Sequence, residues 1–185
     1  GEPQIGSYGL YFGRITEEKG VETVVQAYEK LQKYTVKIMG DDTTEEAIRL
    51  KRYIKEHKIK NIEFLGFKSG EELEDIIKGA RFTLIPSIWY DNLPNTALES
   101  FQYSKPVIAS NIGSLPELVV DGENGYLFKP ADAEDLIKKI KLLDDDTVVE
   151  KMGAASRRRL ESRFSPETHY EALMKVFSEA VKNNK

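Results

Sequence analysis

Residues 81–120 read RFTLIPSIWYDNLPNTALESFQYSKPVIASNIGSLPELVV, a stretch in which short apolar runs alternate with loops. The first run, 82–85, has the length and side-chain branching of a buried strand, and it stops at Pro86, which cannot donate to a sheet. Pro94 suits the first turn of a helix, and a second branched run follows at 107–109. The stretch therefore predicts a strand, a loop, a helix, a second strand and a second loop.

The same alternation extends to both sides of this stretch. Further strands are expected at residues 8–12, 36–39, 62–65 and 126–128, with helical patterns between them. Strands that alternate with helices form parallel sheets covered by those helices. The sequence thus predicts an α/β fold: a Rossmann-like, doubly wound parallel sheet of about six strands with helices on both faces. Such sheets bind ligands beyond the carboxyl ends of their strands.

Composition narrows the class of protein. The chain has 185 residues, 40% of them hydrophobic and 31% charged, which predicts a single globular domain over residues 1–185. A net charge of −4 argues against a nucleic-acid partner. No apolar run reaches membrane-spanning length and the N-terminus lacks a signal-peptide pattern, so we expect no direct membrane insertion and a cytoplasmic location. The absence of cysteine excludes disulfides and thiolate metal sites within this sequence.

Two carboxylates in the first stretch are candidates for a site. Helical side chains lean toward the helix N-terminus, so Glu99 can reach a ligand seated at the start of its helix, where free backbone N–H groups attract phosphate. Asp91, in the preceding loop, would lie on the other side of that ligand. Considered alone, two such acids are more often solvated surface residues than members of a site.

A second candidate element follows the first strand. Gly13-Arg14 and Lys19-Gly20 flank a loop between a strand and a helix, a layout typical of phosphate sites. Neither the dinucleotide fingerprint G-x-G-x-x-G nor the P-loop pattern is present. Guanidinium and ammonium groups make charge-assisted bonds to phosphate, although an isolated loop Arg or Lys is usually just solvated.

Taken together, these motifs resemble the retaining, nucleotide-sugar-dependent glycosyltransferases of family 4, which have the two-domain GT-B architecture. The matching elements are Gly13-Arg14, Lys19-Gly20, Pro86-Ser87, Asp91, Leu93-Pro94, Glu99, the Ser-Leu-Pro-Glu of 114–117 and the Asp-Gly-Glu-Asn-Gly of 121–125. Two positions depart from the family pattern. Asp91 stands where the family usually has Glu, and Gly113-Ser114 replaces a Gly-Gly pair.

The resemblance implies a specific activity and an incomplete enzyme. It identifies the chain as the C-terminal, donor-binding half, with the N-terminal acceptor-binding domain absent. The whole protein would transfer a sugar from a nucleoside diphosphate sugar to an acceptor hydroxyl with retention, without a metal or another cofactor. A membrane-peripheral location through the absent domain is then an alternative to a purely cytoplasmic one. Other functions left open are a nucleotide-sugar-binding or regulatory module without transfer activity, and a sugar-nucleotide epimerase.

The resemblance also assigns roles to residues. Arg14 and Lys19 would hold the diphosphate, Asp91 would face the donor sugar, and Glu99 would accept the ribose hydroxyls. The loop after the third strand would contact the nucleobase, although an ordinary strand-to-helix turn is the alternative there. The complete predicted donor-binding set is Gly13, Arg14, Lys19, Gly66, Phe67, Lys68, Asp91, Asn92, Leu93, Pro94, Asn95, Thr96 and Glu99.

No metal site is predicted. Asp144-Asp145-Asp146 satisfies the D-x-D pattern of metal-dependent glycosyltransferases, but it lies between two expected helices and not at a strand end. We interpret it as a helix N-cap. His57 and His169 have no second histidine at a ligand spacing.

Overall fold

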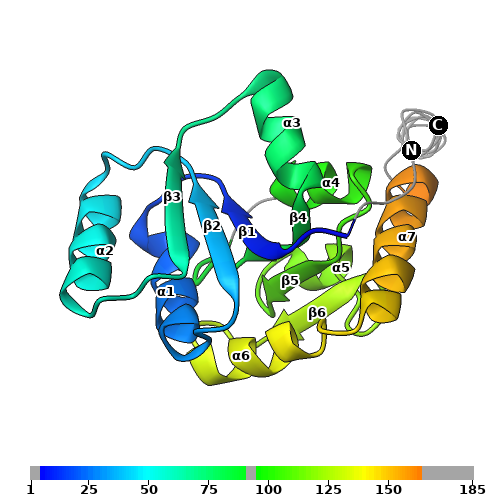
Figure 1. Cartoon of the computed structure of the whole chain (residues 1–185). Coiled ribbons are helices and arrows are strands. Elements are labelled where there is room, and N and C mark those ends of the chain that lie inside the picture. Colours follow the sequence, from blue (N-terminus) through cyan, green and yellow to red (C-terminus); the bar gives the residue numbers. More distant parts are fainter. Residues whose placement is uncertain (1–4, 91–94, 164–185) are drawn as a thin grey trace, which may run out of the picture.

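The computed structural model describes residues 5–90 and 95–163. Its centre is a six-stranded sheet with the order β3-β2-β1-β4-β5-β6, in which every neighbouring pair is parallel (Figure 1). The strands are β1 (Tyr8–Phe12), β2 (Thr35–Met39), β3 (Ile62–Gly66), β4 (Ala80–Ile85), β5 (Val107–Ser110) and β6 (Gly125–Phe128). All six strands expected from the sequence are present, and their bounds differ from the predicted ones by no more than two residues.

Helices connect successive strands and cover the sheet. They are η1 (Glu17–Lys19), α1 (Val21–Lys30), α2 (Glu45–Glu56), α3 (Gly70–Lys78), α4 (Asn95–Gln102), α5 (Leu115–Leu118), α6 (Ala133–Lys141) and α7 (Asp146–Arg163). The short helix α5 forms where the sequence analysis expected only a loop. The sequence also predicts a helix that starts at Ser165-Pro166, but these residues lie outside the described ranges.

Both faces of the sheet are buried, as predicted. In β1, Tyr11 belongs to the apolar cluster shared with α1, α2 and α6, whereas its neighbours Leu10 and Phe12 belong to a cluster that contains Ile77 of α3. Neighbouring residues of a strand point to opposite faces. Ile108 of β5 likewise packs with the first cluster, while the residues on either side of it pack against α4 and α5.

The start of α2 lies one residue later than the sequence pattern suggested. Thr43 and Glu46 have the spacing of a capping box, which predicts Thr43 as the N-cap, but the N-cap is Thr44, whose Oγ1 accepts a hydrogen bond from the backbone N–H of Ala47 (3.2 Å). Thr43 is engaged elsewhere, because its hydroxyl donates to Asp41 Oδ1 (2.6 Å). Thr44 Oγ1 also donates to the carbonyl of Ile15 (2.7 Å), which fastens α2 to the loop after β1.

Two glycines hold the loops at the carboxyl ends of β1, β2 and β4 close together. A Cβ on Gly20, whose φ is +67°, would lie 2.0 Å from the carbonyl oxygen of Pro86. A Cβ on Gly40 would lie 2.1 Å from the carbonyl oxygen of Gly13. The backbone N–H of Ile88 also donates to the carbonyl of Glu18 (3.0 Å). Only glycine allows these close approaches, so these loops form one continuous edge.

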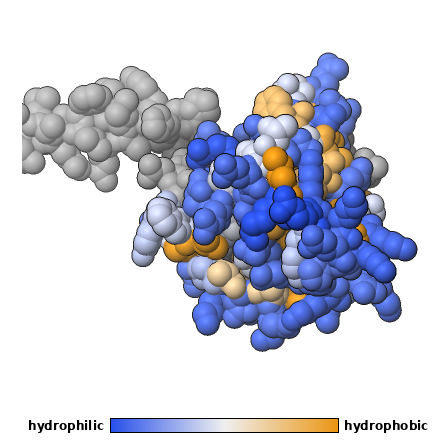
Figure 2. All heavy atoms as spheres, turned by 90° about the vertical axis from the view of Figure 1, so that its left-hand side faces the viewer, coloured by the Kyte–Doolittle hydropathy of each residue, from blue (hydrophilic) through white to orange (hydrophobic). Residues whose placement is uncertain are grey.

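The described helices show no membrane-spanning character. Over residues 5–90 and 95–163, no helix combines the length and the apolarity that crossing a bilayer requires. Figure 2 shows the side of the molecule on which α2 lies, where the surface is mostly hydrophilic and hydrophobic residues are scattered between charged ones.

Candidate functional site

A cavity of about 470 Å³ opens at the carboxyl edge of the sheet, in the size range of small-molecule sites. It is bordered by the ends of β1, β2 and β3 and by the first turns of α3 and α4. The lining residues are Phe12, Gly13, Arg14, Ile15, Thr16, Met39, Gly40, Asp41, Thr44, Phe67, Lys68, Leu73, Thr96 and Glu99. This is the edge at which a doubly wound sheet binds ligands.

The structure brings together residues that the sequence analysis took from three separate segments. Six predicted site residues line the cavity: Gly13, Arg14, Phe67, Lys68, Thr96 and Glu99. Three others are not among its lining residues: Lys19 of η1, Gly66 at the end of β3 and Asn95 at the start of α4. Asp91, Asn92, Leu93 and Pro94 lie outside the described residues, so their placement stays a prediction.

Arg14 supplies positive charge to the cavity. Its side chain is exposed, and within the described residues it forms no ion pair. Its carbonyl accepts a hydrogen bond from the Tyr11 hydroxyl, which holds the backbone of this loop against β1. An unpaired guanidinium in a cavity is available to bind an anion such as phosphate.

Glu99 of α4 supplies a carboxylate to the same cavity. It is half-buried, and no hydrogen bond or ion pair to it occurs among the described residues. Burial raises the pKa of the Glu99 carboxyl group above its ordinary value. A partly desolvated carboxylate without a partner gains most when a ligand brings hydroxyl donors to it.

A buried chain of hydroxyl groups fixes the start of α4 and therefore the position of Glu99. Thr83 of β4 donates through Oγ1 to Ser100 Oγ (2.8 Å), and Ser100 donates to the carbonyl of Thr96 (2.6 Å). Thr83 and Ser100 are fully buried. The sequence analysis missed both, because they are short polar residues inside an apolar strand and an amphipathic helix.

Asp41 is a lining residue that the sequence analysis did not single out. Its Oδ1 accepts hydrogen bonds from the backbone N–H (3.0 Å) and the hydroxyl (2.6 Å) of Thr43. These bonds, the hydroxyl one first, lower the pKa of the Asp41 carboxyl group. Asp41 could have been identified from its position two residues after the end of β2, because ligands bind at that edge of the sheet.

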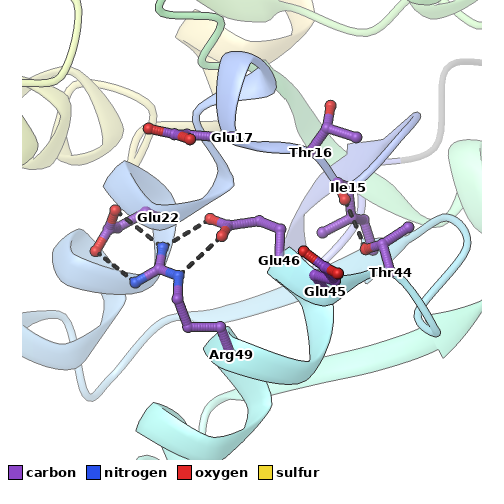
Figure 3. A pocket seen from close by; sticks show the side chains of 8 residues that line it. All are labelled: Ile15, Thr16, Glu17, Glu22, Thr44, Glu45, Glu46 and Arg49. Atoms are coloured by element: carbon purple, nitrogen blue, oxygen red, sulfur yellow. Dashed lines mark hydrogen bonds and ion pairs between the residues drawn. The ribbon is translucent and has the colours of Figure 1, made fainter.

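A second cavity, of about 580 Å³, lies beside the first, between η1 and the start of α2 (Figure 3). Its lining includes the acids Glu17, Glu22, Glu45 and Glu46 and one cation, Arg49. Figure 3 shows the Arg49 guanidinium between the carboxylates of Glu22 and Glu46, with N–O distances of 2.7 to 3.1 Å. Because its cation is already paired and the remaining charge is negative, this cavity disfavours phosphate.

Two predictions remain, that the aspartate run at 144–146 caps a helix and that the chain has no metal site. Asp145 Oδ1 accepts the backbone N–H of Thr147 (2.8 Å), so the aspartate run caps α7 as predicted. Over the described ranges, no group of three or more His, Cys, Asp or Glu side chains is arranged to hold a metal ion.

The sequence matches a known family over most of its length. The family described as "Glycosyl transferases group 1" covers residues 6–159. An uncharacterized glycosyltransferase of Methanocaldococcus jannaschii is 28% identical over 173 residues, which are 94% of this chain and 48% of that protein. A glycogen synthase of Mycobacterium tuberculosis is 29% identical over 181 residues, which are 95% of this chain and 43% of that protein.

Solved structures have the same fold. A sucrose-phosphate synthase from Thermosynechococcus elongatus superposes with a TM-score of 0.83 at 25% identity, over 96% of this chain and 46% of that chain. The C-terminal domain of a glycosyl transferase group 1 family protein from Francisella tularensis superposes with a TM-score of 0.76 at 24% identity, over 88% of both chains. The second similarity, at under 25% identity, shows the fold alone.

These matches also show what share of each relative's length this chain covers. The chain spans less than half the length of the two curated relatives described above. The matched region, the parallel sheet and the cavity at its carboxyl edge all agree with the same assignment. The chain belongs to the glycosyl transferases group 1 family and has the fold of a GT-B glycosyltransferase domain.

Proposed function

We propose that this chain is the donor-binding half of a retaining, metal-independent glycosyltransferase. The complete protein moves a sugar from a nucleoside diphosphate sugar to an acceptor hydroxyl. One observation carries the proposal: a cation, Arg14, and a half-buried carboxylate, Glu99, come from distant segments to line a single cavity at the ligand-binding edge of the sheet, and neither forms an ion pair with another described residue. A nucleoside diphosphate offers the matching groups, an anionic diphosphate and a ribose diol.

In this proposal Arg14 binds the diphosphate. Its guanidinium makes charge-assisted hydrogen bonds to phosphate oxygens and offsets the negative charge that builds on the leaving diphosphate. Lys19 is the second cation in the proposed role, although it is not among the residues that line the cavity. Two fixed cations can do the charge neutralisation that a divalent metal performs in other transferases.

Glu99 and Asp91 are proposed to bind different parts of the donor. The ionised Glu99 carboxylate accepts hydrogen bonds from the ribose hydroxyls, which relieves its lack of a partner in the unliganded cavity. Asp91 faces the donor sugar, where a carboxylate near the anomeric carbon stabilises the positive charge of the transition state. Asp91 lies outside the described residues and follows, three positions later in the sequence, Ile88, whose backbone N–H donates to the carbonyl of Glu18.

Relatives of the same fold support a nucleotide sugar as the ligand. An Anabaena protein solved in complex with UDP-glucose superposes on 94% of this chain with a TM-score of 0.81. At 21% identity this match supports the fold, and the choice of donor for the present chain remains our proposal.

The two carboxylates provide the experiment that tests the proposal. Glu99→Gln should weaken binding of a nucleoside diphosphate and of its sugar conjugate to the same extent, by roughly 1.5 to 3 kcal/mol, because charge-assisted bonds to the ribose are lost. Asp91→Asn should leave binding of the bare diphosphate nearly unchanged and should lower transfer in the complete enzyme. The measurements are calorimetric titrations of this chain with UDP, GDP and ADP and their sugars, and kinetics of the two-domain protein.

Arg52→Gln is a suitable control, because Arg52 is an exposed residue of α2 outside the cavity. Asp91→Glu, which restores the usual family residue, should be tolerated better than Asp91→Asn. If Asp91→Asn weakens the bare diphosphate as much as Glu99→Gln does, the assignment of the two acids is wrong. If no nucleoside diphosphate binds, the proposed function itself fails.

A further inference from the structure

Two successive carbonyl groups in the loop after β1 are bonded to side-chain hydroxyl groups from outside that loop. The carbonyl of Arg14 accepts the hydroxyl of Tyr11, which lies within β1. The carbonyl of Ile15 accepts the hydroxyl of Thr44, the N-cap of α2 (2.7 Å), and Figure 3 shows this bond. The peptide groups that follow Arg14 and Ile15 are therefore fixed relative to β1 and α2.

The residue before Arg14 is held as well. The backbone N–H of Gly13 donates to the carbonyl of Met39, at the end of β2 (3.0 Å). The φ of Gly13 is +150°, and its carbonyl oxygen lies so close to Gly40 that a Cβ there would be 2.1 Å away. The backbone of Arg14 is thus fixed on both sides, whereas its side chain is exposed and forms no ion pair within the described residues.

A fixed backbone that carries a free guanidinium is well suited to binding an anion. A loop that becomes ordered only when a ligand binds subtracts the cost of that ordering from the affinity, and a loop that is ordered beforehand avoids it. The groups that hold a binding residue in place can therefore matter for affinity without touching the ligand.

Two tyrosines of one core cluster differ in the use of their hydroxyl groups. Tyr11 is 4% exposed and Tyr28 is fully buried, and both pack in the cluster shared with α1, α2 and α6. The Tyr28 hydroxyl has no hydrogen-bond partner in the described part of the chain, whereas the Tyr11 hydroxyl bonds to the carbonyl of Arg14. A phenylalanine ring could fill the core at either position, but it could not make the bond to the Arg14 loop.

We infer that Tyr11 and Thr44 are positioning residues of the donor site. Their hydroxyl groups hold the backbone of Arg14, so that its guanidinium meets the diphosphate without prior ordering of the loop. Tyr11 acts only through Arg14, because it is not among the residues that line the cavity. The inference rests on the proposed function, in which Arg14 binds the diphosphate.

Tyr11→Phe removes the hydroxyl and keeps the ring. We expect NMR titrations of this chain with UDP, GDP and ADP to show the variant binding the preferred diphosphate of the wild type about 3- to 10-fold more weakly, the effect of one hydrogen bond. Tyr28→Phe is the matched control, because it removes a buried hydroxyl without a partner, and it should keep the wild-type affinity. Wild-type affinity in Tyr11→Phe, or equal losses in the two variants, would overturn the role of Tyr11.

A double-mutant cycle separates the positioning of Arg14 from a general loosening of the core. Without the guanidinium there is nothing left to position, so adding Tyr11→Phe to Arg14→Gln should cause no further loss of affinity. Glu99 and Lys19 are unchanged in this background, and NMR titration measures the weak binding that they retain. A loss by the same factor with and without Arg14 would show that Tyr11 only supports the fold.

Thr44 also caps α2, so its test must separate the two roles. Thr44→Ala loses both the cap and the bond to Ile15, and should weaken the diphosphate, whereas Thr44→Ser restores a hydroxyl and should recover affinity relative to Thr44→Ala. Asp132→Ala is the control for a lost cap, because Asp132 caps α6 by accepting the backbone N–H of Asp135 (3.0 Å) and does not line the cavity. It should lower stability and leave binding unchanged. No recovery in Thr44→Ser, or an equal loss of affinity in Asp132→Ala, would refute the role of Thr44.

Failure of this inference differs from failure of the proposed function. If the wild type binds a nucleoside diphosphate and the Tyr11→Phe and Thr44→Ala variants bind it equally well, only the positioning roles are lost. If the wild type binds none of UDP, GDP and ADP, the proposed function and this inference are both refuted.

Discussion

At the scale of single residues, Glu99, the proposed ligand of the ribose, occupies surroundings that are unfavourable for a charged carboxylate. It is half-buried without a partner among the described residues, and burial raises the pKa of its carboxyl group. The charged form is therefore less favourable in the folded chain than in the unfolded one. Residues that a ligand must reach are commonly left in such unfavourable surroundings.

Replacing this carboxylate should therefore stabilise the unliganded chain. Below about pH 4.3, the ordinary glutamate pKa, the carboxyl group is protonated in both states and Glu99→Gln should change little. As pH rises, the unfolded chain releases its proton first, so the wild type loses stability relative to the variant, and the deficit persists at neutral pH. Denaturant titrations from pH 4 to pH 8 should show the free energy of unfolding of Glu99→Gln rising relative to that of the wild type. A variant that is less stable at pH 7 would contradict this reading.

At the scale of elements, the site depends on loops that touch one another. The loop after β1 meets the loop after β4 at Gly20, where only hydrogen fits against the Pro86 carbonyl. The hydrogen bond from Ile88 to Glu18 joins the same two loops. Arg14 lies in the first of these loops, so the geometry of its backbone depends on this contact.

Gly20→Ala tests that dependence. A left-handed φ costs about 1–2 kcal/mol for alanine, and the clash with Pro86 adds about 1–3 kcal/mol. Gly122→Ala is the control, because Gly122 also has a positive φ (+80°) but nothing within 4 Å of an added Cβ. We expect denaturant titration to show a larger loss for Gly20→Ala, and calorimetry to show weaker nucleoside diphosphate binding for Gly20→Ala only. Equal losses for the two variants would show that the contact with Pro86 is unimportant.

At the scale of the whole molecule, the chain covers less than half of the relatives reported above, and its function is proposed as one half of a transferase. Orientation of an acceptor and exclusion of water need groups beyond those that bind the donor. The alternative of a stand-alone binding module makes the same prediction for this chain, so the two differ only in the complete protein.

This chain alone should bind a nucleoside diphosphate equally well in EDTA and in Mg²⁺, and it should transfer no sugar. The first expectation follows from the proposed use of Arg14 and Lys19 in place of a metal, and the second from the proposal that this chain binds only the donor. Calorimetry in both buffers and a product assay with simple acceptors would check them. Binding that disappears in EDTA would count against the metal-independent mechanism, and measurable turnover against the half-enzyme interpretation.

Much of the fold followed from the sequence because its signals are local. The branched run at 82–85 that ends at Pro86 predicted β4, and the alternation of such runs with helical patterns predicted a parallel sheet with both faces covered. Local competition explains the shifted cap of α2: the sequence favours Thr43, which has Glu46 at capping-box spacing, but the hydrogen bond to Asp41 occupies the Thr43 hydroxyl and Thr44 caps the helix. The Gly13-Arg14 pair and Glu99 were likewise recognisable as short motifs.

The tertiary structure decided which of these residues share a cavity. Strand order pairs the ends of β2 and β3, and Asp41 and Phe67, which follow those ends, line the same cavity although they are far apart in the sequence. The Thr83–Ser100 bond that positions Glu99 also joins two segments that are separate in the chain. Sequence patterns report the periodicity of one element at a time, whereas the chemistry of a site depends on contacts between elements, which exist only once the sheet is assembled.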